Sequence, residues 1–412
     1  MGRIIQILTI LFGIVFIGLG YSKANEYVQN EYIIKLKSTK KANSSLQFFF
    51  EKTQNSRKMI KTIAGMYYVE MDQKDLDGFK KSYGSEIQFI EPNYIYTIAD
   101  FEEAEDKVIP KGQWGLNATA GVNAEKAWKK TKGKPSVVVA VIDTGVDYNH
   151  YALDSSMWRN TGEVFDGTDS DGNGYVDDVF GINVINNSGD PLDDHGHGTH
   201  CAGIIAADSP SLKGVAPKVS IMGIKFLTKK GEGTLAGAIE AIEYAVDHGA
   251  DVLSNSWGGK VGSEGLEEAI KYAERMGVLF VAAAGNKNYN NDKKGSYPAN
   301  YKVPNVISVA ASTSSGRKAY FSNYGKQSVD LFAPGDRILS SFLNNKTKTL
   351  SGTSMATPFV SGAAALYYSY YGKMHYSVVK EAIFEGTDYS SSFKNYVLTS
   401  GKLDVYKMLL ED

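Results

Sequence analysis

The sequence predicts an α/β fold, in which an open parallel sheet carries helices on both faces and a small α+β domain precedes it. Residues 136–142 (SVVVAVI) form a near-continuous apolar run, which is typical of a parallel strand buried on both faces. Similar apolar runs recur at 219–226, 250–254, 278–283 and 306–311, with amphipathic helical patterns at 234–248 and 263–276 between them. Because strands and helices alternate, we expect functional residues at the carboxyl ends of the strands.

The small N-terminal domain is predicted over residues 25–99. The expected elements are strands over 31–37, 63–71 and 86–96 and helices over 44–52 and 73–83. This order is typical of a ferredoxin-like split βαβ unit. Residues 100–112 begin with the acidic stretch DFEEAED and contain a Pro-Lys-Gly break. We interpret them as a solvated linker before a large domain over 113–412.

The first 24 residues have the pattern of a secretory signal peptide. Arg3 precedes an apolar run over 4–19, and Ser22-Lys23-Ala24 offers a small-x-small cleavage site. This run is shorter than the about 20 residues that a membrane span usually needs. We therefore expect a secreted protein that loses residues 1–24, and an uncleaved membrane anchor is the alternative.

Composition indicates a soluble globular protein without a nucleic-acid partner. The 412 residues carry a formal net charge of −2 and are 43% hydrophobic, with neither a basic excess nor a long acidic run. The single cysteine, Cys201, excludes an internal disulfide. An exported chain without disulfides needs another source of stability, such as bound ions.

Residues 350–360 (LSGTSMATPFV) predict a nucleophile at the start of a helix. Gly352 permits a tight turn before Ser354, and Pro358 is expected near the first helical turn, where a missing N–H costs least. Free N–H groups and the helix dipole at this position stabilise an oxyanion. A serine here can also be a plain helix cap. The whole GTSMATP motif favours a nucleophile, which needs a histidine base oriented by a carboxylate.

Asp143 and His197 are the candidates for the carboxylate and the base. Asp143 ends the apolar strand, and His197 opens HGTHCAGIIAA, where small and apolar residues predict a helix. The triplet Asp-Thr-Gly at 143–145 is also the motif of aspartic peptidases, whose chemistry needs two carboxylates sharing one proton. The chain has no second such triplet in an apolar strand, so that alternative would require a dimer.

The stretch DDHGHGTHC at 193–201 contains ligand types of a metal site. The zinc-peptidase motif places two histidines four residues apart with a glutamate between them, whereas His197 and His200 are three apart. We interpret His197 as the base, His200 as structural and His195 as a loop residue. Cys201 shares a helix face with His197. It is expected to be a small buried residue beside the imidazole, and a thiol-sensitive enzyme is the alternative.

Three segments together resemble the subtilisin-like serine peptidases (subtilases): VAVIDTGVD around Asp143, HGHGTHCAG around His197 and LSGTSMATPFVSGAAAL around Ser354. The order Asp, His, Ser is that of subtilisin, and the resemblance covers about residues 114–409. It implies a subtilisin-like three-layer α/β/α fold and a serine endopeptidase that acts on polypeptides through a catalytic triad and an acyl-enzyme. A catalytically silent binding protein on the same scaffold is the alternative, against which the complete catalytic set argues.

The resemblance also implies substrate-binding residues. Asn286 in AAAGN matches the asparagine of the oxyanion hole. The residues implied in backbone pairing and in the walls of the S1 pocket are Ser256, Trp257, Gly258, Ala284 and Gly285. Trp257 is bulkier than the leucine of many relatives. The segment 295–299, which resembles the far wall of S1, has no acidic residue, so we expect no strong preference for a basic P1 side chain.

Residues 25–99 resemble an inhibitor-type propeptide that ends near FIEPNY. This implies a zymogen whose own propeptide assists folding, inhibits the enzyme and is removed by a cut between about residues 96 and 111. The mature enzyme is expected to be a monomer.

Residues 169–178 (DSDGNGYVDD) predict a structural calcium site. Oxygen donors alternate and Gly174 stands at position six, as in the first half of an EF-hand loop, but position twelve is Phe180 instead of the closing glutamate. The expected Ca²⁺ ligands are Asp169, Asp171, Asn173, the backbone carbonyl of Tyr175, and Asp178. A plain Asp/Asn/Gly turn is the alternative.

Overall fold

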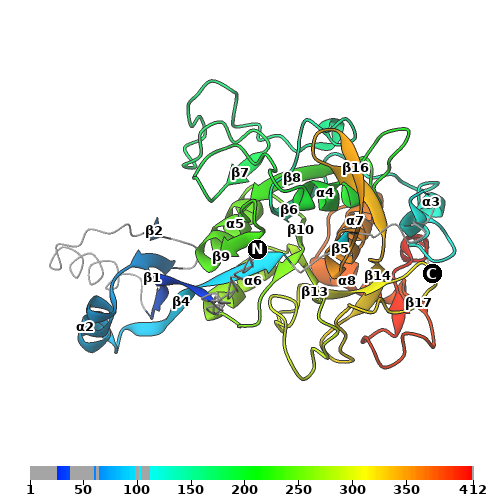
Figure 1. Ribbon diagram of the computed structural model, residues 1–412. Helices are drawn as coiled ribbons and strands as arrows, with labels where there is room; N and C mark the ends of the chain where they lie inside the picture. Colours follow the sequence, from blue (N-terminus) through cyan, green and yellow to red (C-terminus); the bar gives the residue numbers. More distant parts are fainter. Residues whose placement is uncertain (1–25, 38–59, 62–64, 99–101, 104–111, 411–412) are drawn as a thin grey trace, which may run out of the picture.

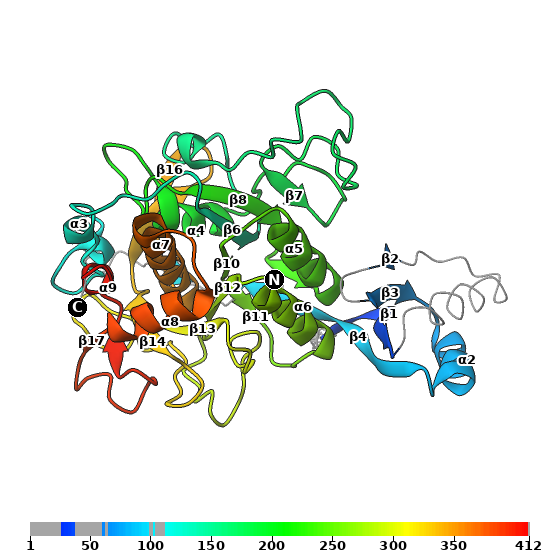
Figure 2. The ribbon, with the colours of Figure 1, turned by 180° about the vertical axis from the view of Figure 1, so that it is seen from behind.

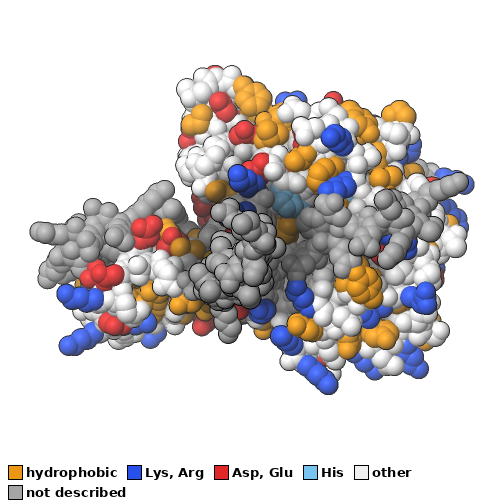
Figure 3. Space-filling model, in the orientation of Figure 1, with side chains coloured by type: hydrophobic (Ala, Val, Ile, Leu, Met, Phe, Trp, Pro, Cys, Tyr) orange, Lys and Arg blue, Asp and Glu red, His pale blue; other side chains and the backbone are white. Residues whose placement is uncertain are grey.

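The computed structural model describes residues 26–37, 60–61, 65–98, 102–103 and 112–410 (Figure 1). The predicted signal peptide and the helix expected over 44–52 lie outside the described residues. In Figure 3 the small N-terminal domain projects from one side of the large domain, and Lys and Arg side chains are scattered over the surface of the large domain. Within the described ranges, no helix combines the length and the apolar character needed to cross a bilayer.

A nine-stranded sheet forms the centre of the large domain. Its strands are β6 (Val138–Asp143), β7 (Gly181–Asn183), β8 (Ser220–Lys225), β10 (Val252–Asn255), β12 (Leu279–Ala283), β13 (Val306–Ser312), β14 (Leu331–Pro334), β17 (Asp388–Tyr389) and β18 (Gly401–Lys402). They are ordered β17-β18-β14-β13-β12-β10-β6-β8-β7. Every neighbouring pair is parallel except β17 and β18. The predicted parallel sheet is therefore confirmed.

Helices cover both faces of this sheet. One layer contains α3 (Ala124–Ala127), α4 (His197–Ala206), α7 (Thr353–Tyr371), α8 (Tyr376–Glu385) and α9 (Val405–Met408). The other contains α5 (Leu235–Asp247) and α6 (Glu264–Arg275), which lie together in Figure 2, apart from α7 and α8. Alternate residues of β6 serve the two cores: Val139 and Val141 face α4 and α7, whereas Ala140 and Ile142 face α5 and α6. This arrangement is the predicted three-layer α/β/α architecture.

The small domain is built from antiparallel strands and one described helix. Its elements are β1 (Tyr27–Leu36), β2 (Ile60–Lys61), β3 (Met66–Glu70), α2 (Gln73–Tyr83) and β4 (Ile87–Ile98). β1 lies between β3 and β4. The side chain of Asp72 accepts a hydrogen bond from the backbone of Asp75, so it caps α2 at the predicted boundary.

The end of the small domain is inserted into the large one. β4 pairs antiparallel with β9 (Glu232–Thr234) on one side and with β11 (Trp257–Gly258) on the other. Four residues later, β5 (Glu102–Glu103) pairs with β16 (Lys346–Ser351), which forms a hairpin with β15 (Ile338–Phe342). Residues 102–103 of the predicted linker thus form a short strand, because β16 offers these two residues an edge to pair with. The solvated linker over 100–112 otherwise stays a prediction.

Candidate active site

Asp143 and His197 meet at the carboxyl end of β6. His197 is the first residue of α4 and its Nδ1 lies 2.8 Å from Asp143 Oδ1, with both side chains fully buried. Asp143 Oδ1 also accepts a hydrogen bond from the backbone N–H of Thr144. The close approach of α4 to the turn after β6 requires Gly198, because a Cβ there would lie 2.1 Å from the carbonyl oxygen of Gly145. Asp143 therefore shares its carboxylate with an imidazole, as in a triad, instead of with a second carboxylate.

Ser354 is the second residue of α7 and faces the same site. Its hydroxyl donates to the backbone carbonyl of Ser256 at 3.0 Å, so the hydroxyl has to rotate before it can give its proton to His197. The N–H of Ser354 is one of the first four of the helix, which have no intrahelical acceptor. Helix α7 therefore presents both a hydroxyl and a backbone N–H to this site.

Pro358 lies one turn deeper in α7 than the sequence predicted. The helix begins at Thr353, so Pro358 is its sixth residue and lacks the N–H that would bond the carbonyl of Ser354. Two side chains satisfy this carbonyl instead: the hydroxyl of Ser256 donates at 2.9 Å, and the thiol of Cys201 lies at 3.5 Å. The expectation that Pro358 belongs to the first turn is corrected, and the missing hydrogen bond is replaced locally.

Asn286 follows β12, and its side chain is oriented by Thr353, the residue before Ser354. Its Oδ1 accepts hydrogen bonds from both the backbone N–H and the hydroxyl of Thr353, each at 2.8 Å. Since the carbonyl end of the amide is used in this way, its NH₂ end is directed away from Thr353. The backbone N–H of Gly285 donates to the Thr353 hydroxyl at 3.1 Å, which ties the two segments together.

The remaining polar residues of the stretch 193–201 have structural partners. Asp193 accepts hydrogen bonds from the backbone N–H groups of His195 and Gly196 and from Thr199, and so holds the start of α4. The Nζ of Lys225, which is buried, lies 2.6 Å from an oxygen of Asp194. His200 Nε2 lies within hydrogen-bonding distance of the carbonyls of Ile338 and Lys348.

Burial shifts the pKa values of His200 and Cys201. It holds the pKa of His200 at about 3 and raises the pKa of the Cys201 thiol. Asp143, His197 and Cys201 each offer an atom within 4.8 Å of the others, so the thiol lies beside the base as expected. Within this stretch, His197 contacts Asp143, whereas Asp193 and His200 are engaged with other groups of the fold.

The cleft beside this site is filled by β4. On one edge of β4, Ile98 pairs with Trp257 and Thr97 with Gly258 of β11. On its other edge, Tyr96 pairs with Gly233 of β9. The ring of Tyr96 packs edge-on against Trp257, with centroids 5.5 Å apart. The bulk of Trp257 therefore forms one wall of a pocket for an aromatic side chain.

Comparisons with known proteins agree with this geometry. The model of the subtilase family matches residues 134–397. Thermitase from Thermoactinomyces vulgaris is 38% identical over 289 residues, which are 69% of this chain and 92% of thermitase. The chain belongs to the subtilase family. It is a serine endopeptidase, as the three motifs predicted.

Other relatives of this subtilase are longer. The thermophilic serine proteinase of Bacillus sp. (strain AK1) is 38% identical over 283 residues, covering 68% of this chain and 63% of that protein. Fervidolysin from Fervidobacterium pennivorans, described as a keratinolytic enzyme related to subtilisin, superposes with a TM-score of 0.75 at 24% identity, over 94% of this chain and 62% of the fervidolysin chain. The fervidolysin match shows the fold.

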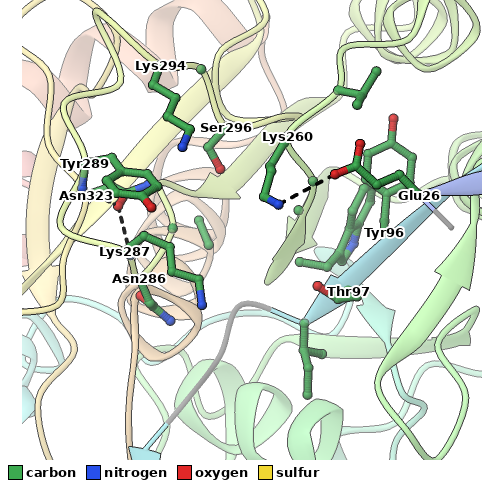
Figure 4. A pocket seen from close by; sticks show the side chains of 18 of the residues that line it. Glu26, Tyr96, Thr97, Lys260, Asn286, Lys287, Tyr289, Lys294, Ser296 and Asn323 are labelled. Atoms are coloured by element: carbon green, nitrogen blue, oxygen red, sulfur yellow. Dashed lines mark hydrogen bonds and ion pairs between the residues drawn. The ribbon is translucent and has the colours of Figure 1, made fainter. Parts of the chain in front are cut away.

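A cavity of about 230 Å³ lies beside β11 and the segment that carries Asn286 (Figure 4). Trp257, Gly258, Gly285 and Ser296 line it, and its role as the S1 pocket stays a prediction. Ala284 does not line the cavity: its side chain packs against Val329 and Phe332 in a separate core cluster, and Ala283 takes its place. The successive side chains of this segment point to opposite sides, which explains the exchange.

The predicted calcium ligands divide into two adjoining groups. Asp169 and Asp171 cluster with Glu163, which lies outside the loop motif and precedes it by six residues. Asp178 instead clusters with Asp171 and His248, and it accepts hydrogen bonds from Asn160 and from Tyr244.

The other two predicted ligands are engaged differently. Asn173 directs its amide NH₂ to the carboxylates of Asp171 and Asp178, and its Oδ1 accepts from the backbone of Tyr175. The hydroxyl of Tyr175 donates to Glu240. The ligand predicted from this residue is its backbone carbonyl, which stays a prediction. Of the predicted set, Asp171 therefore belongs to both groups, whereas Asp169 belongs only to the group with Glu163 and Asp178 only to the group with His248.

Proposed function

We propose that this subtilase is a secreted, self-processing endopeptidase made as a zymogen. His197 accepts the proton of Ser354 while Asp143 holds the imidazole, and the Ser354 oxygen attacks a peptide carbonyl. Asn286 and the Ser354 N–H donate to the oxyanion. His197 then protonates the leaving amine, and water hydrolyses the acyl-enzyme with His197 again acting as the base.

The observation that carries the zymogen proposal is the pairing of β4 with both edges of the cleft. Main-chain pairing of this kind is how extended substrates add to a sheet edge. The N–H of Ile98 donates to the carbonyl of Gly231 at 2.9 Å, in addition to its pairing with Trp257. The segment therefore binds as a substrate would, and it blocks the cleft until it leaves.

The register favours one bond for self-cleavage. Trp257 pairs with Ile98, and Ser256, the preceding residue, contacts Ser354 through its carbonyl. The antiparallel order thus leads from Ile98 toward the nucleophile, and Glu102 is next found beside Ser351. Residues 99–101 lie outside the described residues. We propose that the bond between Ala99 and Asp100 is cut.

Comparison of the wild type with Ser354→Ala tests this proposal. We expect the wild type to lose residues up to 99, to start at Asp100 by N-terminal sequencing, to react with a phosphonate serine probe and to hydrolyse casein. Ser354→Ala is expected to keep residues 25–99 and to react with no probe. Identical processing of both proteins would refute self-cleavage, and a different new N-terminus would refute only the assigned bond.

We further propose a structural Ca²⁺ bound by Glu163, Asp169 and Asp171. Glu163 is 5% exposed, and its Oε1 accepts from the backbone N–H groups of Ser170 and Asp171. Its Oε2 is buried without a hydrogen-bond donor among the described residues. A buried carboxylate oxygen beside two further carboxylates calls for a cation, and oxygen ligands suit calcium. Glu163 supplies the carboxylate that the EF-hand-like loop lacks at its end.

A further inference from the structure

Three lysines line the cavity beside β11. Lys260 follows β11, Lys287 follows the oxyanion residue Asn286, and Lys294 belongs to the opposite wall. Figure 4 shows these three side chains extending from separate segments around one space, with Ser296 between Lys294 and Lys260. The Lys294 ammonium lies 4.1 Å from the ring centroid of Tyr289, which also lines the cavity.

Glu26 is the single carboxylate among the described residues that line this cavity, and it belongs to the segment proposed to be removed. It forms an ion pair with Lys260 at 3.6 Å. Loss of residues up to 99 would take this carboxylate away. The cavity of the mature enzyme would then be lined by lysines 260, 287 and 294, with no acidic side chain from the described residues around it.

The position of the cavity suits the side chain that precedes the proposed scissile bond. It opens between β11 and Asn286, next to Ile98, which is the last described residue of the bound segment. The next residue in the sequence is Ala99, which carries no charge. Self-cleavage therefore does not test the charge preference of this cavity.

We propose that the cavity selects polypeptide substrates with an acidic residue, glutamate in particular, immediately before the bond to be cut. The inference rests on the proposed endopeptidase function and names its substrate class. Lys287 and Lys294 are the specificity-determining residues, and the hydroxyl of Ser296 is a further donor for the carboxylate. Because all three ammonium groups are exposed to solvent, the preference is moderate and decreases with salt.

Matched peptides that differ only at this position test the proposal. They carry Tyr-Thr-Ile-X before the bond, as β4 does, with X as Glu, Gln, Lys or Ala. For the mature wild type, we expect kcat/KM for Glu to exceed that for Gln by roughly three- to tenfold at low salt. The ratio should fall toward one at about 0.5 M NaCl, where the Debye length is a few ångströms.

Charge reversal identifies the residues responsible. Lys287→Glu and Lys294→Glu should each lower the Glu/Gln ratio and raise cleavage after Lys. Lys293→Glu is the matched control, because Lys293 is exposed, adjacent in sequence and not part of the cavity lining. It changes the net charge equally and should keep the wild-type ratio.

The outcomes separate the two proposals. If the Ala peptide is cleaved but the Glu/Gln ratio is one or less, the acidic preference is wrong and the endopeptidase function stands. An equal loss of the ratio in Lys293→Glu would also overturn the assignment to the cavity. If no peptide is cleaved, including that with Ala, the proposed function fails and the inference falls with it.

Discussion

The nucleophile is positioned through its backbone carbonyl as well as through its place on the helix. Pro358 leaves the Ser354 carbonyl without its helical donor, and Ser256 and Cys201 occupy the position of that donor. The site thereby links the start of α7 to β11 and to α4. Cys201, which was expected only as a small buried neighbour of His197, also contacts the backbone carbonyl of Ser354.

Cys201 should make the enzyme sensitive to mercurials without being needed for activity. Cys201→Ser retains a donor for the Ser354 carbonyl, so we expect casein hydrolysis within about threefold of the wild type. A mercurial should inactivate the wild type slowly, because the thiol is 1% exposed and its raised pKa keeps the thiolate scarce. Activity assayed over time with the reagent measures this. A wild type that is active and fully resistant would contradict the prediction.

Asn286 should contribute to rate far more than to substrate binding. Loss of an oxyanion donor typically lowers kcat by about 10²- to 10³-fold, and we expect this for Asn286→Ala with little change in KM. Asn286→Asp is the matched variant, since it keeps an acceptor for Thr353 but has no amide donor. Steady-state kinetics on one peptide compares the three proteins. Near-normal kcat in the Asp variant would show that the amide serves only to hold Thr353.

At the level of elements, β4 does more than fill the cleft, because it also caps two helices of the large domain. Glu91 accepts hydrogen bonds from the hydroxyl of Ser263 and from the N–H groups of Glu264 and Gly265 at the start of α6. Asn93 accepts from the N–H of Ala236 at the start of α5. An anion at a helix N-terminus is stabilised by the unpaired N–H groups and the helix dipole.

Weakening this cap should shorten the latent period of the zymogen. In the full-length protein, Glu91→Gln removes a charge-assisted set of hydrogen bonds, which contribute about 1.5–3 kcal/mol. We expect the cleaved segment to dissociate about ten- to a hundredfold faster, measured as the lag between self-cleavage and casein hydrolysis. Asp77→Asn, an equal charge change on the exposed side of α2, should leave the lag unchanged. Equal lags in both variants would argue that backbone pairing alone holds the segment.

The acidic loop should couple calcium to stability. In the Ser354→Ala precursor, which cannot digest itself, excess Ca²⁺ should raise the unfolding midpoint relative to EDTA. Saturation at about a hundred times Kd corresponds to about 2.7 kcal/mol. Glu163→Gln should lose most of this shift, whereas Asp166→Asn, an exposed carboxylate of the same loop, should keep it. Calorimetric titration with Ca²⁺ measures binding directly, and an unchanged Kd in Glu163→Gln would remove Glu163 from the ligand set.

Elements with strong periodicity were predictable, and those that exist only through long-range pairing were not. The apolar runs at 219–226 and 278–283 correspond to β8 and β12 within one residue at each end, and α2 agrees with its predicted range. By contrast, β5, β9 and β11 contain two or three residues each and are defined by partners far along the chain. No local pattern specifies such strands.

Site residues that come together only through long-range contacts were likewise not predictable from a local pattern. The proposed triad and Asn286 could be named from the sequence because each belongs to a recognisable local motif. Glu163 and the three lysines of the cavity carry no motif of their own, and they come together only through the fold. The possible signal for Glu163 was the missing glutamate at position twelve, which implied a carboxylate from elsewhere.

For the molecule as a whole, His200 links acid stability to the packing of α4 against the β15–β16 hairpin. Burial holds its pKa at about 3, below the ordinary value of 6.5. Between these values the unfolded chain binds one proton more than the folded chain, so this contribution is complete above pH 6.5 and is lost as the pH falls toward 3. The slope attributable to one proton is about 1.4 kcal/mol per pH unit.

A comparison of pH profiles tests this assignment. Urea unfolding of the Ser354→Ala precursor should show stability decreasing from about pH 7 to pH 4, where buried neutral histidines must charge. Adding His200→Gln should lower the free energy of unfolding at neutral pH. It should also reduce the slope of that free energy against pH by the contribution of about one proton. Parallel profiles for the two proteins would assign the acid sensitivity to other groups.

The sheet shared by β4, β9 and β11 has a consequence for how activity depends on concentration. While the chain is continuous, the inhibitory strand is tethered beside the cleft, and its effective local concentration is of millimolar order for a short connection. One broken bond turns it into an ordinary bimolecular ligand, whose occupancy depends on how much protein is present. The cleaved complex should therefore stay silent when concentrated and become active on dilution. Vacated strand edges that bind the next polypeptide would then shift the balance further toward activity.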